Sequence, residues 1–248
     1  TGAEKMKIKE KIKIREIVPF LSLIAVILFF EIVTNGTLLT FKNMKLIFNQ
    51  AFVLIIGSVA CSFIVAQGDV DFSMGSMVGI TAVCAAWVSQ VAGGLALPAA
   101  MILGAVLGVI NGILFVKFKI PSFVVTLSTL MILRGLTIFI AGGGSVSVPF
   151  SLYKYDSFPL KLVLCIVVIL AATFCFNYTK LGKWSKAIGS GITAAHQSGV
   201  PVGKMRLFGY GLSAAMCGLC GFFNMVRAGS AATNTGNFFE TDVLIAVV

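Results

Sequence analysis

The sequence has few charged residues. Asp, Glu, Lys and Arg make up 11% of its 248 residues, whereas they make up roughly 25% of a typical soluble domain. Apolar residues make up 58% before the 26 glycines are counted, and the mean hydropathy is +1.02. A surface that faces water needs more polar side chain than this, so the composition excludes a soluble globular domain, a disordered chain and a nucleic-acid-binding module. We expect lipid to be the solvent for most of the chain.

The residues that build catalytic and metal sites are also scarce. His196 is the single histidine, so it has no second histidine with which to form a metal site or an acid–base pair. The six cysteines all lie in apolar stretches, and Cys217-Gly-Leu-Cys220 lacks the βαβ context of a redox motif. No GxxxxGK[ST] phosphate loop is present, and no nucleophile, base and orienting group occur together. The sequence therefore predicts a protein that is not an enzyme, with no catalytic residue, no metal and no cofactor.

Long stretches without charge predict membrane-spanning helices, since a bilayer core of roughly 30 Å needs about 20 helical residues. The stretch from Phe72 to Val116 is long enough for two crossings, with Gly93, Gly94 and Pro98 in its middle. The other predicted spans are Ile17–Val33, Leu46–Gly68, Ser122–Ala141, Leu162–Thr179 and Leu207–Val226. The sequence thus predicts an all-α membrane protein, a polytopic transmembrane helix bundle of about seven complete spans plus the start of an eighth at Val243. Because six residues cannot cross a bilayer, we expect a chain that is truncated at its C-terminus.

The lysines and arginines predict the orientation of the bundle. Six of the nineteen lie in residues 5–15 and five in residues 180–206, which fall on one side of the membrane. By the positive-inside rule this side is the cytoplasm, so the N-terminus is predicted to be cytoplasmic. The net charge of +10 then reflects topology and attraction to anionic membrane lipid rather than nucleic acid.

This charge pattern divides the chain into two predicted parts. Residues 1–16 form a basic cytoplasmic N-terminal segment, and residues 17–248 form one transmembrane domain with a cytoplasmic loop at 179–205. The basic segment either retains the first helix on the cytoplasmic side or lies on the membrane surface as an amphipathic segment.

A few polar side chains lie within the predicted spans, where each needs a partner or water. Arg134 and Asp71 either form a buried pair that fixes the helix register or act directly along a substrate path. The residues that we assign to a candidate substrate path are Asp71, Ser73, Asn111, Thr126, Arg134 and Asn224. Glycines spaced four residues apart predict close helix packing, and they are Gly75, Gly79, Gly104, Gly108 and Gly112.

The loop 179–205 contains a short predicted helix. Gly189 and Gly191 precede it, and Gly199 and Pro201 end it, as is usual at a helix C-terminus. A short helix between two spans, parallel to the membrane surface, is suited to docking a partner; the alternative is a loop helix with no partner. The predicted helix and its C-terminal glycine comprise Ile192, Thr193, Ala194, Ala195, His196, Gln197, Ser198 and Gly199.

Several ordered motifs resemble one family of membrane proteins. Gly68-Asp-Val-Asp71-Phe-Ser73-Met-Gly75-Ser76 is similar to the signature of the permease subunits of bacterial ABC importers in the ribose/simple-sugar branch, which includes autoinducer-2 permeases. Ile120-Pro121-Ser-Phe-Val-Val-Thr126-Leu and Leu133-Arg134-Gly135 resemble further blocks of that family, and the resemblance covers residues 17–248. The chain departs from the family at Asp69, where the family has glycine. It also departs at Thr193 and His196, where the family often has Glu and a basic residue.

The resemblance implies a binding-protein-dependent importer in the bacterial inner (plasma) membrane. The chain is expected to be the membrane-spanning permease subunit of an ATP-binding-cassette importer that moves a sugar or similar small polar solute into the cell. Its implied partners are an ABC ATPase subunit, an extracytoplasmic solute-binding protein and a second permease subunit, identical or different. Residues 192–199 are then the element that couples the ATPase to the path. The alternative is a secondary transporter driven by an ion gradient, with Asp69 and Asp71 as its membrane carboxylates.

Overall fold

The computed structural model describes the backbone of residues 2–248 and the side chains of residues 17–248. The chain divides into two compact units between Gln50 and Ala51. The side chains of the predicted basic segment, residues 1–16, lie outside the described residues, and the predicted domain boundary after residue 16 stays a prediction.

The first unit holds helix α1 (Gly2–Val33), a turn, and the beginning of helix α2 (Phe41–Val65). The turn reverses the chain because Asn35 and Gly36 both adopt left-handed backbone conformations. Glu31 stabilises it, since its Oε2 accepts a hydrogen bond of 3.0 Å from the backbone N–H of Leu39. The apolar part of α1, Ile17–Val33, is the first span that the sequence predicts.

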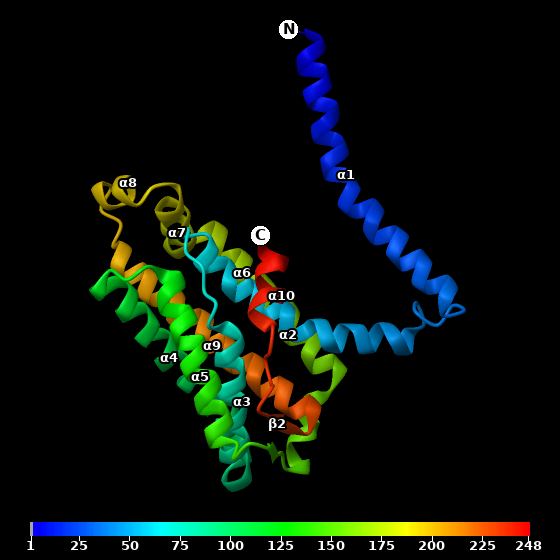
Figure 1. Ribbon diagram of the computed structural model, residues 1–248, viewed down its shortest axis with the longest axis vertical. Coiled ribbons are helices and arrows are strands. Elements are labelled where there is room, and N and C mark those ends of the chain that lie inside the picture. The colour runs from blue at the N-terminus through cyan, green and yellow to red at the C-terminus, as the bar shows by residue number, and fades with distance from the viewer. Residues whose placement is uncertain (1) are drawn as a thin grey trace. The chain divides into compact units, whose positions relative to one another are not determined.

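The second unit contains the rest of α2 and eight further α-helices. These are α3 (Met74–Val91), α4 (Ala96–Phe118), α5 (Ser122–Ile140), α6 (Phe158–Tyr178), α7 (Lys180–Ser190), α8 (Ile192–Gln197), α9 (Val202–Ala228) and α10 (Phe239–Val247). Two short 3-10 helices, η1 (Gly93–Leu95) and η2 (Phe150–Asp156), and two short strands, β1 (Ser145–Ser147) and β2 (Ser230–Ala232), connect them. Figure 1 shows α3 and α9 side by side within this unit.

Six helices of the described chain are long and apolar enough to cross a membrane. They are α2, α3, α4 together with η1, α5, α6 and α9. The helical membrane architecture predicted from the sequence is therefore confirmed, whereas the count of about seven complete spans stays a prediction. The sequence did not indicate the two strands, which pair antiparallel with Val146 opposite Ala231.

Small residues bring α4 and α9 into close contact. A Cβ added at Gly104 or Gly108 would collide with the backbone oxygens of Ala214 and Tyr210 on α9. Gly112 approaches Leu207 in the same way, with 3.1 Å between the added Cβ and the Leu207 Cα. The predicted packing role of these glycines is confirmed, because only glycine lets the two backbones come this near.

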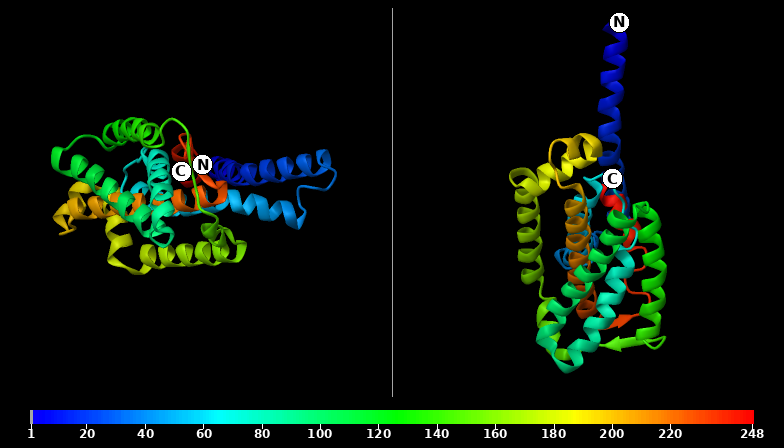
Figure 2. Two further views of the ribbon diagram at one scale, coloured as in Figure 1. Left: turned by 90° about the horizontal axis from the view of Figure 1, so that it is seen from below. Right: turned by 90° about the vertical axis from the view of Figure 1, so that its left-hand side faces the viewer.

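The two ends of the second unit differ. One end carries α7 and α8, which we call the α8 end, and the other carries β1 and β2, which we call the hairpin end; the right view of Figure 2 shows them at opposite ends of the unit. At the hairpin end Gln90 of α3 donates a hydrogen bond to the carbonyl of Ser147. The α8 end has a small core of its own, formed by Ile188, Ala195, Val200 and Met205.

The last helix begins earlier than the sequence predicts. The predicted eighth span starts at Val243, whereas α10 starts at Phe239, because the side chains of Phe239 and Val243 both pack on Gly57 of α2. Between β2 and α10, residues 233–238 are not helical. In Figure 1 this stretch leads from β2 at the hairpin end back into the bundle beside α3.

Candidate functional site

The signature segment builds the N-terminus of α3. Asp71 lies in the loop just before the helix, and its Oδ1 accepts hydrogen bonds from the backbone N–H of Ser73, at 2.8 Å, and from the Ser73 hydroxyl, at 2.6 Å. A carboxylate here satisfies a donor that the first helical turn leaves open and is favoured by the helix dipole. Asp71 is 1% exposed. The Asp-x-Ser spacing therefore starts the helix and at the same time buries a carboxylate.

A chain of hydrogen bonds runs from this carboxylate across three helices. The Thr129 hydroxyl of α5 donates to Asn111 Oδ1 of α4 at 2.7 Å, and Asn111 Nδ2 donates to the Ser73 oxygen at 3.0 Å. The Ser73 hydroxyl then donates to Asp71. Every donor in the series points toward the carboxylate, so each bond polarises the next. We call Asp71, Ser73, Asn111 and Thr129 the polar chain.

The polar chain contains three of the six residues that the sequence assigns to a path. Thr126 is fully buried, but its hydroxyl faces the carbonyl of Phe123 in its own helix, 3.4 Å away. Asn224 is half-buried in α9, and the structure does not join it to the polar chain. Thr129 is the member that sequence reasoning missed. Thr129 is half-buried, and its spacing of three residues from Thr126 and eight from Thr137, the buried threonines of α5, was the available signal.

Arg134 does not pair with Asp71, so the pair that the sequence suggested is wrong. Its guanidinium donates to two backbone carbonyls beyond β2, those of Thr235 at 2.8 Å and Gly236 at 2.6 Å. Its nearest carboxylate is Glu240 of α10, with 3.9 Å between Nη2 and Oε2. Asp71 instead uses Ser73, because the turn before α3 brings that hydroxyl within reach.

The short helix of the α8 end is present where the sequence predicts it. Helix α8 runs from Ile192 to Gln197, and Gly199, with a φ of +77°, ends it. The N–H of Val200 bonds back to the carbonyl of Ala195 and that of Gly199 to His196, which is the glycine-based helix end expected here. Ala195 is buried in the small core, and its assignment to the docking element stays a prediction. The exposed members of the predicted docking element are Ile192, Thr193, Ala194, His196, Gln197, Ser198 and Gly199.

The loop between α2 and α3 joins the α8 end to the polar chain. Gln67, 4% exposed, donates to the Ser185 hydroxyl of α7 at 3.4 Å and fills the space over Gly209 of α9. Gly189 of α7 lies against the carbonyl of Ala66, where a Cβ would collide. The loop continues directly into Asp71. The loop that precedes the polar chain therefore contacts both α7 and α9.

Asp69, the unexpected acid of the signature, binds Arg206 of α9. Asp69 Oδ2 lies 3.0 Å from Arg206 Nε, and Oδ1 accepts a hydrogen bond of 3.1 Å from a terminal guanidinium nitrogen. The guanidinium also stacks over Phe115, 4.4 Å from its ring centroid. Burial raises the pKa of Asp69 to about 6, although Arg206 opposes that shift.

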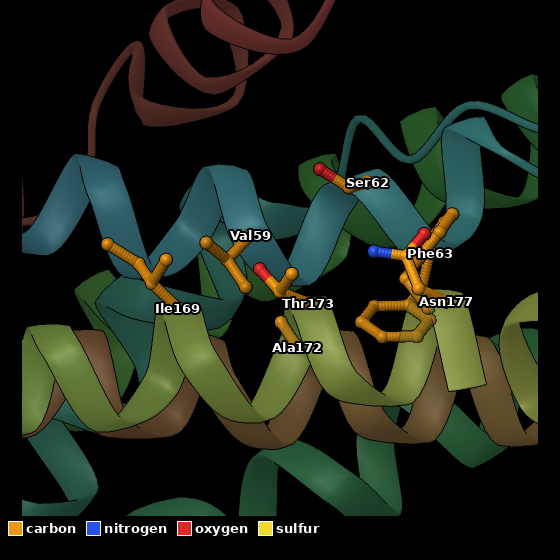
Figure 3. A pocket seen from close by; sticks show the side chains of 8 residues that line it. Val59, Ser62, Phe63, Ile169, Ala172, Thr173 and Asn177 are labelled. Carbon is orange, nitrogen blue, oxygen red and sulfur yellow. The ribbon is translucent and has the colours of Figure 1, made fainter. Parts of the chain in front are cut away.

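Two of the cavities in the second unit lie beside α8 and between α2 and α6, and neither is lined by the polar chain. One, of about 840 Å³, lies between α8, the turn at Lys119–Pro121 and the start of α9, and His196 and Arg206 both line it. The other, of about 300 Å³, lies between α2 and α6; Figure 3 shows Val59 and Phe63 facing Ile169 and Ala172 across it. The lining of this second cavity is mostly apolar, with Ser62, Thr173 and Asn177 as its polar members and no charged side chain.

The sequence of this chain matches known permeases. Residues 43–248 match the family described as Branched-chain amino acid transport system / permease component. The chain belongs to that permease family. The chain is 29% identical over 242 residues to the ribose import permease protein RbsC of Escherichia coli, a match that covers 92% of this chain and 75% of the relative. No solved structure matches it.

A second relative is named for a different solute. The autoinducer 2 import system permease protein LsrC of Yersinia pestis is 27% identical over 237 residues, covering 92% of this chain and 68% of the relative. The permease is a multi-pass membrane protein and the permease component of a binding-protein-dependent ABC importer, a transport subunit without catalytic activity. Family membership implies a complex with an ATPase and a binding protein, so the expected ABC importer is confirmed over the ion-driven alternative.

Proposed function

We propose that this permease moves a sugar or a similar small polar solute into the cell, along a path that the polar chain lines. The observation that carries the proposal is the polar chain itself, a directed series of hydrogen bonds from α5 through α4 to the Asp71 carboxylate. Hydroxyl, amide and carboxylate groups match the hydroxyl groups of a sugar. Relatives that import ribose and autoinducer 2 support the same class of solute.

The α8 end is the cytoplasmic end in this proposal, which makes the N-terminus cytoplasmic and the hairpin end extracytoplasmic. Basic residues concentrate at the α8 end, as the positive-inside rule requires. They are Lys117, Lys119, Lys180, Lys183, Lys186, Lys204 and Arg206, against Lys154, Lys161 and Arg227 toward the hairpin end.

The exposed residues of α8 are the docking site for the ATPase, and the solute-binding protein docks at the hairpin end. A second permease subunit completes the path. When the ATPase moves α8 and α7, the contacts of Gln67 with Ser185 and of Gly189 with Ala66 pass the motion to the loop before Asp71. The permease itself hydrolyses nothing, and its contribution is the change in access to the polar chain.

Uptake into proteoliposomes tests the substrate class. The permease is reconstituted with its ATPase and binding protein, and uptake of labelled ribose is measured with unlabelled ribose or leucine as competitor. We expect ribose-type sugars to compete and leucine to have no effect; inhibition by leucine alone would overturn the sugar assignment.

The same assay tests the polar chain. Thr129→Val removes one hydrogen bond, worth about 1 kcal/mol, and should reduce uptake about fivefold. Ser128→Ala, the matched change at an exposed position of α5, should leave uptake unchanged. Equal uptake by both variants would show that the solute does not pass along the polar chain.

A further inference from the structure

The stretch between α9 and the end of α10 is not helical along its whole length. In the non-helical stretch 233–238, two backbone carbonyls lie over glycines of α3. A Cβ added to Gly79 would lie 2.7 Å from the oxygen of Thr235, and one added to Gly75 would lie 2.5 Å from the oxygen of Gly236. The spacing of these two glycines predicts close approach of another helix backbone, but the backbone that approaches them is non-helical. They form a groove that holds non-helical backbone.

Arg134 holds the segment in this groove. Its Nη1 donates to Thr235 and its Nη2 to Gly236. Non-helical backbone at membrane depth is tolerated only where it is buried in protein or lines a water-filled cavity, because its carbonyls need donors. A guanidinium presents several donors in a fixed fork, which suits two adjacent carbonyls. Arg134 thus supplies the hydrogen bonds that continuous helix would have supplied.

The segment also carries the counter-charge of Arg134. Glu240, in the first turn of α10, lies 3.9 Å from the guanidinium, and its side chain is 14% exposed. Its carboxylate fills the space over Gly75, where a Cβ would collide with it. The arginine, the two carbonyls and the carboxylate therefore form one contact between α5 and the segment, across the glycine face of α3.

We propose that Arg134 is a positioning residue that holds residues 235–240 as a gate beside the substrate path. When seated, the segment packs against Gly75, two residues from Ser73 and thus next to the polar chain. When the segment is released from Arg134, the groove over Gly75 and Gly79 on α3 is open next to the polar chain. The proposal rests on the proposed function, because release has a role only if solute passes there.

Hydrogen–deuterium exchange of the importer complex in lipid nanodiscs tests the gate. Amide exchange in residues 233–240 is compared between the nucleotide-free complex and the complex locked with ATP and vanadate. We expect exchange of this segment to be about tenfold faster in one of the two states, since release breaks two charge-assisted hydrogen bonds. Equal exchange in both states would mean that the segment never leaves the groove, and this would overturn the gate.

Variants test whether Arg134 is the residue that holds the segment. Arg134→Gln should speed exchange in residues 233–240 in the state in which the segment is seated, and Arg134→Lys, which keeps the charge but loses the fork, should have a smaller effect. Arg206→Gln is the matched control, and it should change exchange only near residues 66–70. If exchange in residues 233–240 is the same in Arg134→Gln and in the parent, Arg134 does not hold the segment.

A second variant covers the outcome in which Arg134→Gln fails to fold. Gly79→Ala places a methyl group against the Thr235 carbonyl and should displace the segment with Arg134 intact. Gly135→Ala is its control, because nothing lies within 4 Å of a Cβ there. Equal exchange in these two variants would overturn the groove. Exchange does not depend on which solute is carried, so a wrong substrate assignment would leave these results unchanged.

Discussion

Arg134 and Arg206 lie at two levels of the same unit and bind different kinds of partner. Arg206, near the α8 end, pairs with the Asp69 carboxylate, a group that can gain a proton. Arg134 donates hydrogen bonds to two uncharged backbone carbonyls, and its nearest carboxylate, that of Glu240, lies 3.9 Å away. The hydrogen bonds near the α8 end therefore depend on the charge of a side chain, whereas those that seat the 235–240 segment are accepted by neutral backbone.

Of the changes that distinguish these two contacts, removal of Arg134 is expected to lower the stability of the folded permease the most. Arg134→Leu leaves the carbonyls of Thr235 and Gly236 without donors, and each stranded carbonyl costs about 1–3 kcal/mol. Asp71→Leu breaks the hydrogen bonds to Ser73 instead. Because Arg134 and Asp71 have different partners, the loss of stability in the double variant should equal the sum of the losses in the two single variants. Thermal unfolding of the purified variants in detergent measures this. Recovery of stability in the double variant would contradict the assignment of partners.

A smaller effect is expected from pH. The pKa of Asp69 is about 6 in the folded chain and 3.8 ordinarily, so the folded chain binds this proton more tightly. Its contribution to the free energy of unfolding is greatest below pH 3.8 and is lost as the pH rises through 6. Lowering the pH from 7 to 5 should therefore stabilise the parent relative to Asp69→Asn.

The sequence contains one histidine, His196, so the pH series includes a control in which it is replaced. In a His196→Gln background, the difference between the chain that keeps Asp69 and the Asp69→Asn variant should persist. Thermal unfolding midpoints between pH 5 and pH 7 give the comparison. Identical pH dependence with and without the Asp69→Asn substitution would show that the ion pair of Asp69 with Arg206 does not titrate in this window.

Much of the architecture was readable from the sequence because lipid imposes simple rules. Charge-free stretches located the long helices, and the glycines at 104 and 108 identified the face of α4 that packs on α9. Gly199 and Pro201 marked the end of α8 for a local reason, since only the backbone conformation of a few residues is involved.

Long-range contacts were not readable in the same way. Nothing in the sequence indicates that Arg134 binds carbonyls 101 and 102 residues away. Every residue has a backbone carbonyl, so the residue type does not show which carbonyl accepts a hydrogen bond. Gly75 and Gly79 have the same spacing as the glycines of α4, yet they hold a non-helical segment instead of a helix. Thr129 was missed because a single threonine in an apolar helix commonly bonds to its own backbone.

The central claim is that motion at the α8 end reaches the polar chain through the loop that contains Gln67. Gln67→Leu tests it most directly, because it keeps the side-chain volume and removes the hydrogen bond to Ser185. ATP hydrolysis and solute uptake are measured together in proteoliposomes, with Gln90→Leu at the hairpin end as the matched control. The account predicts that Gln67→Leu keeps most of its ATP hydrolysis while uptake per ATP falls severalfold, and that Gln90→Leu keeps the parental ratio. An unchanged ratio of uptake to hydrolysis in Gln67→Leu would contradict it.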